Sequence, residues 1–344
     1  AIALGEEKGF DVVEVSPDDI RARQNLAAAL AREKQYDQAI RQYDLILASP
    51  DASPKDTIAR MYLLLRKGDF QQAAAMTPPN AAPYLGQLLR ALALKRIGGA
   101  YREVAESLDK TESNIDSEGK EFLSELTSLF GKEDASGYLV TELRALCAEG
   151  IQSRVVDTFL ARTLVSAKRL VEAEPVLLDA LTRYGKDKWL HLYAGMVYND
   201  LDRIPEAETH LKACLEIDPN DAEIMNFLGF LYADKNMKLD EAQALLTRAL
   251  ELDPTNGYYL DSMGWVYYRR GNADKAIEYI RKAILAMDSD DDELRNHLGD
   301  AYLLKGDIEE AYAEWRRAHR LNPELKGVQE KLDQYKDKIK AKSR

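Results

Sequence analysis

Residues 257–288 read GYYLDSMGWVYYRRGNADKAIEYIRKAILAMD, and this pattern decides the fold because the chain carries it four times. The other copies are KWLHLYAGMVYNDLDRIPEAETHLKACLEIDP at 188–219, AEIMNFLGFLYADKNMKLDEAQALLTRALELDP at 222–254 and DELRNHLGDAYLLKGDIEEAYAEWRRAHRLNP at 292–323. Each copy runs from an aromatic-rich helix through a turn to an apolar helix and a terminator. A period of about 34 residues is typical of stacked helical hairpins, none of which can bury its apolar face alone.

Small and aromatic residues recur at matched places, the Gly and Tyr residues when counted from the start of each copy and the Ala and Cys residues when counted back from its terminator. Small residues let two helix backbones approach closely, and a tyrosine can fill the gap between hairpins. Turns at 270–272 and 305–307 are expected to end one helix with Gly and cap the next with Asn or Asp. The recurring residues are Gly195, Gly229, Gly264 and Gly299; Tyr198, Tyr232, Tyr267 and Tyr302; Ala207, Ala242, Ala276 and Ala311; and Cys214, Ala249, Ala283 and Ala318.

This set of landmarks resembles the tetratricopeptide repeat, whose pattern places Trp, Leu-Gly, Tyr, Ala, Phe and Pro at similar positions. The resemblance implies an all-α fold, a right-handed superhelical solenoid of stacked antiparallel helix pairs. Extended over the whole chain, the pattern predicts about eight or nine such hairpins and a C-terminal capping helix.

Landmarks present or missing along the chain predict its domain organisation. Pro17 stands where a terminator belongs, and the landmarks are missing between residues 111 and 150. After Pro323, apolar residues at helical spacing from Val328 to Ile339 indicate a terminal helix that closes the stack. The predicted segments are 1–17, a remnant of an incomplete repeat; 18–110, N-terminal hairpins; 111–152, a degenerate repeat or spacer; 153–325, a regular block; and 326–344, the capping helix.

Composition argues against nucleic acid as a partner. The 344 residues are 46% hydrophobic and carry a net charge of −12, with an isoelectric point near 5.1. A nucleic-acid backbone would repel such a chain. The lysines of residues 331–342 are interleaved with acids, which favours a solvated helix face over a nucleic-acid or membrane patch.

The cysteines and the N-terminus say little about the compartment. Cys147 and Cys214 show neither a disulfide framework nor zinc-ligand spacing, and Cys214 takes a small-residue place that predicts burial. No apolar stretch approaches the roughly 20 residues that cross a bilayer. The sequence starts at Ala1 rather than Met, so we expect a processed or excised form, and an upstream signal or lipid-attachment segment stays open.

The sequence shows no constellation of residues that indicates catalysis. Its four histidines, His191, His210, His297 and His319, lack metal-ligand spacing, and no Gly-rich phosphate loop is present. The acidic run 288–293 lacks the central Gly of a calcium loop and fits a helix N-terminus, where the helix dipole favours acids. We therefore expect no enzyme activity, no cofactor, no metal and no small-molecule substrate.

The family resemblance implies that the first helix of each hairpin lines a concave groove for extended peptides or helices. Places two, five, nine and twelve of each copy should face this groove, and exposed Trp and Tyr there would act as binding hot spots. The alternative is that these side chains fill contacts between successive first helices. The predicted groove residues are Trp189, Leu192, Met196, Asn199, Asn226, Phe230, Tyr258, Asp261, Trp265, Tyr268, Arg269, Asn296 and Asp300, with Glu223 and Glu293 at the second places.

The expected function is a non-enzymatic scaffold that binds a protein or peptide segment. Groove lysines and arginines, which clamp chaperone C-termini in some family members, are scarce here apart from Arg269. Residues 188–325 instead resemble repeats of bacterial envelope proteins, often lipoproteins, that act as adaptors in pilus assembly, secretion or protease delivery. That resemblance implies a periplasmic or outer-membrane-anchored protein rather than a cytoplasmic one. The alternative is a structural assembly protein that self-associates or bridges subunits through its convex face and ends.

Overall fold

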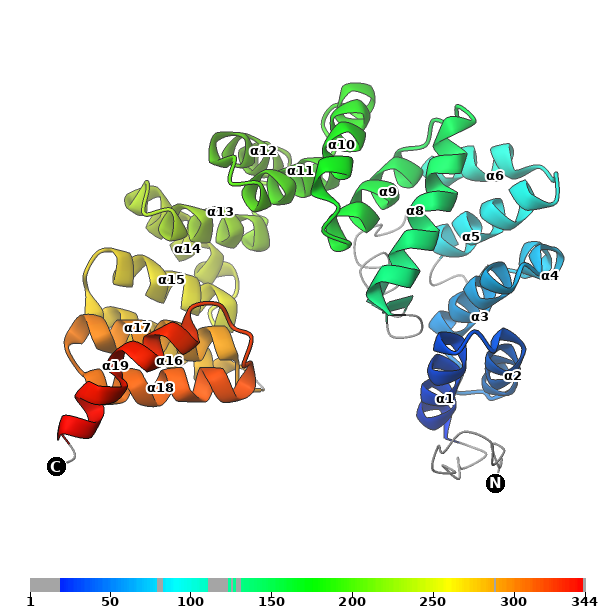
Figure 1. Cartoon of the computed structure of the whole chain (residues 1–344). Coiled ribbons are helices and arrows are strands. Elements are labelled where there is room, and N and C mark those ends of the chain that lie inside the picture. The colour runs from blue at the N-terminus through cyan, green and yellow to red at the C-terminus, as the bar shows by residue number, and fades with distance from the viewer. Residues whose placement is uncertain are drawn as a thin grey trace. The chain divides into compact units, whose positions relative to one another are not determined.

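The computed structural model describes residues 19–78, 83–110, 123–124, 126–127, 131–287 and 289–342 (Figure 1). These residues form helices and no strands, which confirms the predicted all-α fold. The chain divides into two compact units, Ala1–Leu201 and Asp202–Arg344, and each is described by itself. The predicted remnant at 1–17 lies outside the described residues, and the other predicted segment boundaries stay predictions.

Most described helices of the first unit form adjacent pairs closed by a short turn, namely α1–α2, α3–α4, α5–α6 and α9–α10. First helices also contact first helices of the neighbouring pair, as α3 does α5 and α9 does α11. The elements are α1 (Ile20–Arg32), α2 (Tyr36–Leu47), α3 (Pro54–Lys67), α4 (Phe70–Ala75), α5 (Pro83–Arg96), α6 (Tyr101–Ser107), η1 (Leu108–Lys110), α8 (Lys132–Ala148), α9 (Arg154–Ser166), α10 (Leu170–Tyr184) and α11 (Lys188–Asp200).

The second unit repeats this arrangement with greater regularity. First helices α13, α15 and α17 contact one another in order, and each second helix also contacts the first helix of the next pair. The elements are α12 (Ile204–Ile217), α13 (Ala222–Asp234), α14 (Leu239–Leu252), α15 (Gly257–Arg269), α16 (Ala273–Ala286), α17 (Asp292–Lys305), α18 (Ile308–Leu321) and α19 (Val328–Lys342). Helices α12, α14 and α18 end two residues before the terminators Pro219, Pro254 and Pro323, as the repeat predicts.

In three of the four copies, the glycine at the eighth place lets the first helix pack closely on its second helix. A Cβ added to Gly229 would lie 2.8 Å from Leu246 Cγ, and one added to Gly264 would lie 2.6 Å from Ile280 Cγ1. At Gly299 the added Cβ would lie 2.5 Å from the Trp315 ring. Contacts this short exclude a side chain, so the close approach predicted for these positions is confirmed.

The predicted Gly-Asn and Gly-Asp turns form, but their caps differ. Gly271 and Gly306 adopt φ of 75° and 94°, the left-handed region that suits glycine. Asn272 then caps α16 by accepting a hydrogen bond from the Lys275 backbone N–H at 3.1 Å. Asp307 also takes the N-cap position of α18 as expected, but its side chain makes no capping bond and lies 4.0 Å from Lys305 Nζ.

The terminal helix closes the apolar core of the second unit, as expected of a capping helix. Val328 and Leu332 of α19 are buried in a cluster with Trp315 and Tyr302, and Tyr335 packs against it. Cys214 is likewise fully buried, as its small-residue place predicts. No described helix is long and apolar enough to cross a membrane.

Candidate functional site

The predicted groove residues lie on four first helices that fall in both units. Trp189, Leu192, Met196 and Asn199 lie half-buried on α11 in the first unit, where Lys188 Nζ stands 4.9 Å from the Trp189 ring centre. The remaining nine lie on α13, α15 and α17 of the second unit. We call these nine residues, with His297 added, the α13–α15–α17 face.

An aromatic stack occupies the middle of this face. The Trp265 ring stacks on Tyr268 at a centroid distance of 4.5 Å and on the His297 imidazole of α17 at 4.3 Å. Phe230 of α13 lies 6.4 Å from the same imidazole. The expectation that Trp265 is exposed is wrong, since only 8% of it is accessible. Its ring fills the contact between successive first helices, which was the alternative interpretation.

Tyr258 behaves differently from Trp265, although both come from α15. Its side chain is 58% exposed and lies in the first turn of the helix. An exposed tyrosine on the same helix as a buried aromatic stack is available to a partner at little conformational cost. Whether the thirteen predicted residues bind a partner stays a prediction.

A buried histidine–aspartate pair links α15 to α17. His297 Nδ1 lies 2.8 Å from Asp261 Oδ2, and both side chains are largely buried. Burial lowers the pKa of His297, but Asp261, Asp300 and Glu293 together outweigh it, so the pKa is raised above 6.5. Sequence reasoning treated His297 only as one of four scattered histidines. The available signal was its spacing from Asp261, one repeat plus one residue, which places the two on adjacent first helices.

Four buried polar atoms on this face lack a hydrogen-bond partner. They are two acceptors, Asn226 Oδ1 and Asp261 Oδ1, and two donors, Trp265 Nε1 and Arg269 Nε. Arg269 is otherwise held through Nη2, which donates to the Asp234 carbonyl at 2.8 Å, and its guanidinium lies 5.9 Å from the Trp265 ring centre. Native proteins leave few such atoms unpaired, so four on two neighbouring helices mark this face as unusual.

In the last repeat, the polar side chains of the face already accept hydrogen bonds from other residues of the same chain. Lys331 of α19 donates to both Asp300 oxygens, at 2.6 and 2.7 Å, and to Asn296 Oδ1 at 2.8 Å. Trp315 Nε1 also donates to Asp300 Oδ1, at 3.0 Å. Asn296 and Asp300 therefore anchor the capping helix, a role that the sequence did not reveal.

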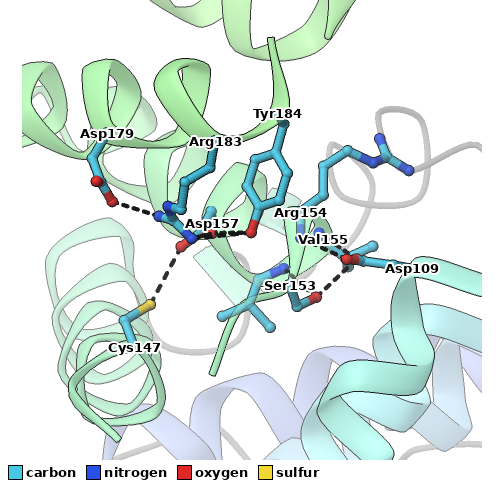
Figure 2. A network of polar contacts seen from close by, with 10 residues as sticks. Asp109, Cys147, Ser153, Arg154, Val155, Asp157, Asp179, Arg183 and Tyr184 are labelled. Carbon is cyan, nitrogen blue, oxygen red and sulfur yellow. Dashed lines mark hydrogen bonds and ion pairs between the residues drawn. The ribbon is translucent and has the colours of Figure 1, made fainter. Parts of the chain in front are cut away.

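A second polar network joins α8, η1, α9 and α10 within the first unit (Figure 2). The Asp157 carboxylate is 3% exposed and accepts hydrogen bonds from Arg183 Nη1 at 2.7 Å and from the Tyr184 hydroxyl at 2.8 Å. Cys147 Sγ lies 3.6 Å from its other oxygen. Burial, reinforced by Asp157, raises the pKa of the Cys147 thiol to about 12, so this cysteine is protonated and unreactive at neutral pH.

Asp109 fixes the start of α9 in the same network. Its carboxylate accepts from the backbone N–H groups of Arg154 and Val155, at 2.9 and 3.0 Å, and from the Ser153 hydroxyl at 2.9 Å. Figure 2 shows Asp109 reaching this helix from a separate element. A carboxylate at a helix N-terminus satisfies orphan N–H groups and complements the helix dipole. This network of the first unit therefore positions and holds α9.

Among the described residues, no group of three or more His, Cys, Asp or Glu side chains could hold a metal ion. In the acidic run, Asp291 caps α17 through the Leu294 N–H at 2.9 Å and Asp290 pairs with Arg295 at 2.6 Å. Asp292 accepts from Asn322 at 2.8 Å. These three acids thus serve the helix start, as expected; Asp288 lies outside the described residues.

Comparison with known proteins supports the assignment of the repeats. Family models described as tetratricopeptide repeat match residues 192–221, 227–292 and 262–324. No curated protein matches the chain.

Solved structures provide a second comparison. A tetratricopeptide repeat protein from Parabacteroides merdae ATCC 43184 is 13% identical, covers 81% of this chain and 97% of its own, and has a TM-score of 0.51. A thermophilic TPR protein from Thermus thermophilus is 20% identical over 53% of this chain and 98% of its own, with a TM-score of 0.46. PilW, a widely conserved type IV pilus biogenesis factor, is 20% identical over 55% and 93%, with a TM-score of 0.47.

Of these three, the Parabacteroides protein alone exceeds a TM-score of 0.5, and its low identity supports the fold and nothing finer. Together with the family models, the matched landmarks and the paired helices, it settles the nature of the repeats. The helical hairpins of residues 192–324 are tetratricopeptide repeats.

Proposed function

We propose that the protein is a non-enzymatic scaffold and that the α13–α15–α17 face binds a segment of another protein. The observation that carries this proposal is the coincidence of exposed Tyr258, the Trp265 stack and four unpaired polar atoms on neighbouring first helices. Stacked helical repeats offer extended surfaces of this kind for partners. Aromatic anchors flanked by polar groups are typical of protein interfaces.

Burial of Trp265 decides how the face should be tested. Removing a buried tryptophan costs about 3–5 kcal/mol, so a loss of binding on Trp265→Ala would not separate contact from unfolding. Tyr258 is the better probe, because an exposed side chain can be replaced with little effect on stability. Leu285 of α16 is its matched control, since it is apolar, 85% exposed and lies on a second helix.

The experiment places a photo-crosslinking amino acid at position 258 or at position 285 of the full chain, in cells that make it. We expect a discrete crosslinked protein from position 258 and none from position 285. The same partner should bind Tyr258→Ala at least several-fold more weakly than the parent chain. Equal crosslinking from both positions would remove the support for this face.

We further propose that the scaffold works in a multiprotein complex of the bacterial envelope. The support is the resemblance of residues 188–325 to the repeats of envelope adaptor proteins. Intact mass measurement of the native protein after membrane fractionation tests this directly. A lipidated or signal-processed N-terminus is expected, and an unprocessed chain in the cytoplasmic fraction would overturn the location without touching the binding face.

A further inference from the structure

The four unpaired atoms of the α13–α15–α17 face share one side of two adjacent first helices. Asp261, Trp265 and Arg269 are spaced by four residues, which aligns them along one side of α15. Asn226 holds the same place in its copy of the repeat, on the neighbouring helix α13, as Asp261 holds on α15. Asp261 and Trp265 are both more than nine-tenths buried, so bulk water does not satisfy these atoms.

Their chemistry is balanced between donors and acceptors. Asn226 Oδ1 and Asp261 Oδ1 accept hydrogen bonds, whereas Trp265 Nε1 and Arg269 Nε donate them. An anionic ligand would leave both acceptors unpaired and would be repelled by the Asp261 carboxylate. A cationic ligand would leave both donors unpaired. A peptide amide carries one donor and one acceptor and complements both kinds of atom.

We propose that these four atoms recognise backbone amides of an extended segment of the partner protein. This inference rests on the proposed function and adds the chemistry of the contact: main-chain amides rather than a terminal carboxylate or a basic side chain. Tyr268 and Arg269 are only half-buried and border Trp265. Their side chains must move to admit the segment, and exposed Tyr258 would cover its flank.

The chain has three tryptophans, and the NMR signals of their indole N–H groups can be followed separately to detect this contact. The indole N–H of Trp265 has no partner, whereas that of Trp315 already donates to Asp300 at 3.0 Å. In the ¹⁵N-labelled full chain, Trp265→Phe identifies the first signal and Trp315 serves as an internal control for unfolding. The probe is N-methylacetamide, the smallest peptide bond, compared with sodium acetate and methylguanidinium at matched ionic strength.

We expect N-methylacetamide to shift the Trp265 indole signal saturably while the Trp315 signal stays in place. Asn226→Ala and Asp261→Ala should each weaken this response at least several-fold. Asn220→Ala is the control, because Asn220 is exposed, lies in the turn before α13 and does not belong to the face. If Asp261→Ala does not fold, Asn226→Ala still tests the site, because Asn226 is only half-buried.

Three results would overturn the inference: no saturable shift with N-methylacetamide, an equal or larger shift with acetate, or a response unaffected by both substitutions. Its failure is distinguishable from failure of the proposed function. If position 258 still crosslinks a partner while the amide probe has no effect, the face binds protein by other contacts. If neither experiment responds, the face is not a binding site.

Discussion

Two buried aspartates on first helices, Asp157 of α9 and Asp261 of α15, show how differently the two units use a polar group. Both are more than nine-tenths buried. Each oxygen of Asp157 has a partner, supplied by Arg183, Tyr184 and Cys147. Asp261 has one oxygen on His297 and one oxygen with no partner.

The Asp157 network holds helices together, whereas the Asp261–His297 pair leaves one hydrogen-bond acceptor without a partner. A buried carboxylate with partners on both oxygens stabilises the helices around it. Removing one of those partners strongly lowers the stability of the fold. A buried carboxylate oxygen without a partner has given up its hydrogen bonds to water and has gained none from the protein in exchange. Asp157 therefore holds helices together, whereas Asp261 keeps one hydrogen-bond acceptor unused.

The strongest test of this contrast removes the two carboxylates in turn. Asp157→Ala should lower the free energy of unfolding around α9 by about 3 kcal/mol, because Arg183 and Tyr184 lose a buried partner. Asp261→Ala should cost less, about 2 kcal/mol, because His297 loses a buried partner but an unpaired oxygen is removed at the same time. Hydrogen exchange read helix by helix measures both. Equal losses of protection at α9 and α15 would erase the distinction.

A smaller effect is expected at the edge of the satisfied network. Asp109→Ala should destabilise the first turn of α9 by about 2 kcal/mol, because two backbone N–H groups and one hydroxyl lose their acceptor. Asp109→Asn is the matched control and should recover part of this, since an amide oxygen still accepts. Unchanged exchange at the start of α9 in Asp109→Ala would show that Asp109 is dispensable there.

The smallest effect is a pH dependence confined to the second unit. Because the folded pKa of His297 is raised above 6.5, its stabilising contribution is complete below pH 6.5 and is lost as pH rises through the raised value. Each tenfold gain in proton affinity on folding is worth about 1.4 kcal/mol of stability. Thermal unfolding followed from pH 6 to 9 should show this loss. His297→Gln should abolish it and His191→Gln on α11 should preserve it; the reverse pattern would reassign the titration.

The sequence predicted the repeating part of this molecule because packing between paired helices leaves a periodic trace. Gly229, Gly264 and Gly299 show that trace, since each faces a second-helix side chain too close for any Cβ. The sequence predicted equally well on which helices the predicted groove residues lie, since they do lie on successive first helices. Both conclusions depend on contacts within one period.

Contacts between elements of different copies were beyond the sequence. The burial of Trp265 depends on His297 from the next hairpin, and the occupation of Asp300 depends on Lys331 from the terminal helix. Asp109 reaches α9 from η1, a short helix that has no counterpart in the repeat. Such long-range pairs leave no periodic trace, so a single sequence does not fix them.

The anchoring of α19 also decides how the second unit would respond to pulling on this helix. Repeats contact only their neighbours, so tension applied at the C-terminus acts first on α19, which is held by Val328, Leu332 and the Lys331 contacts. Peeling this helix away would bring Trp315, now fully buried, to the surface. The fluorescence of that one tryptophan would then report mechanical load before any other part of the second unit yields.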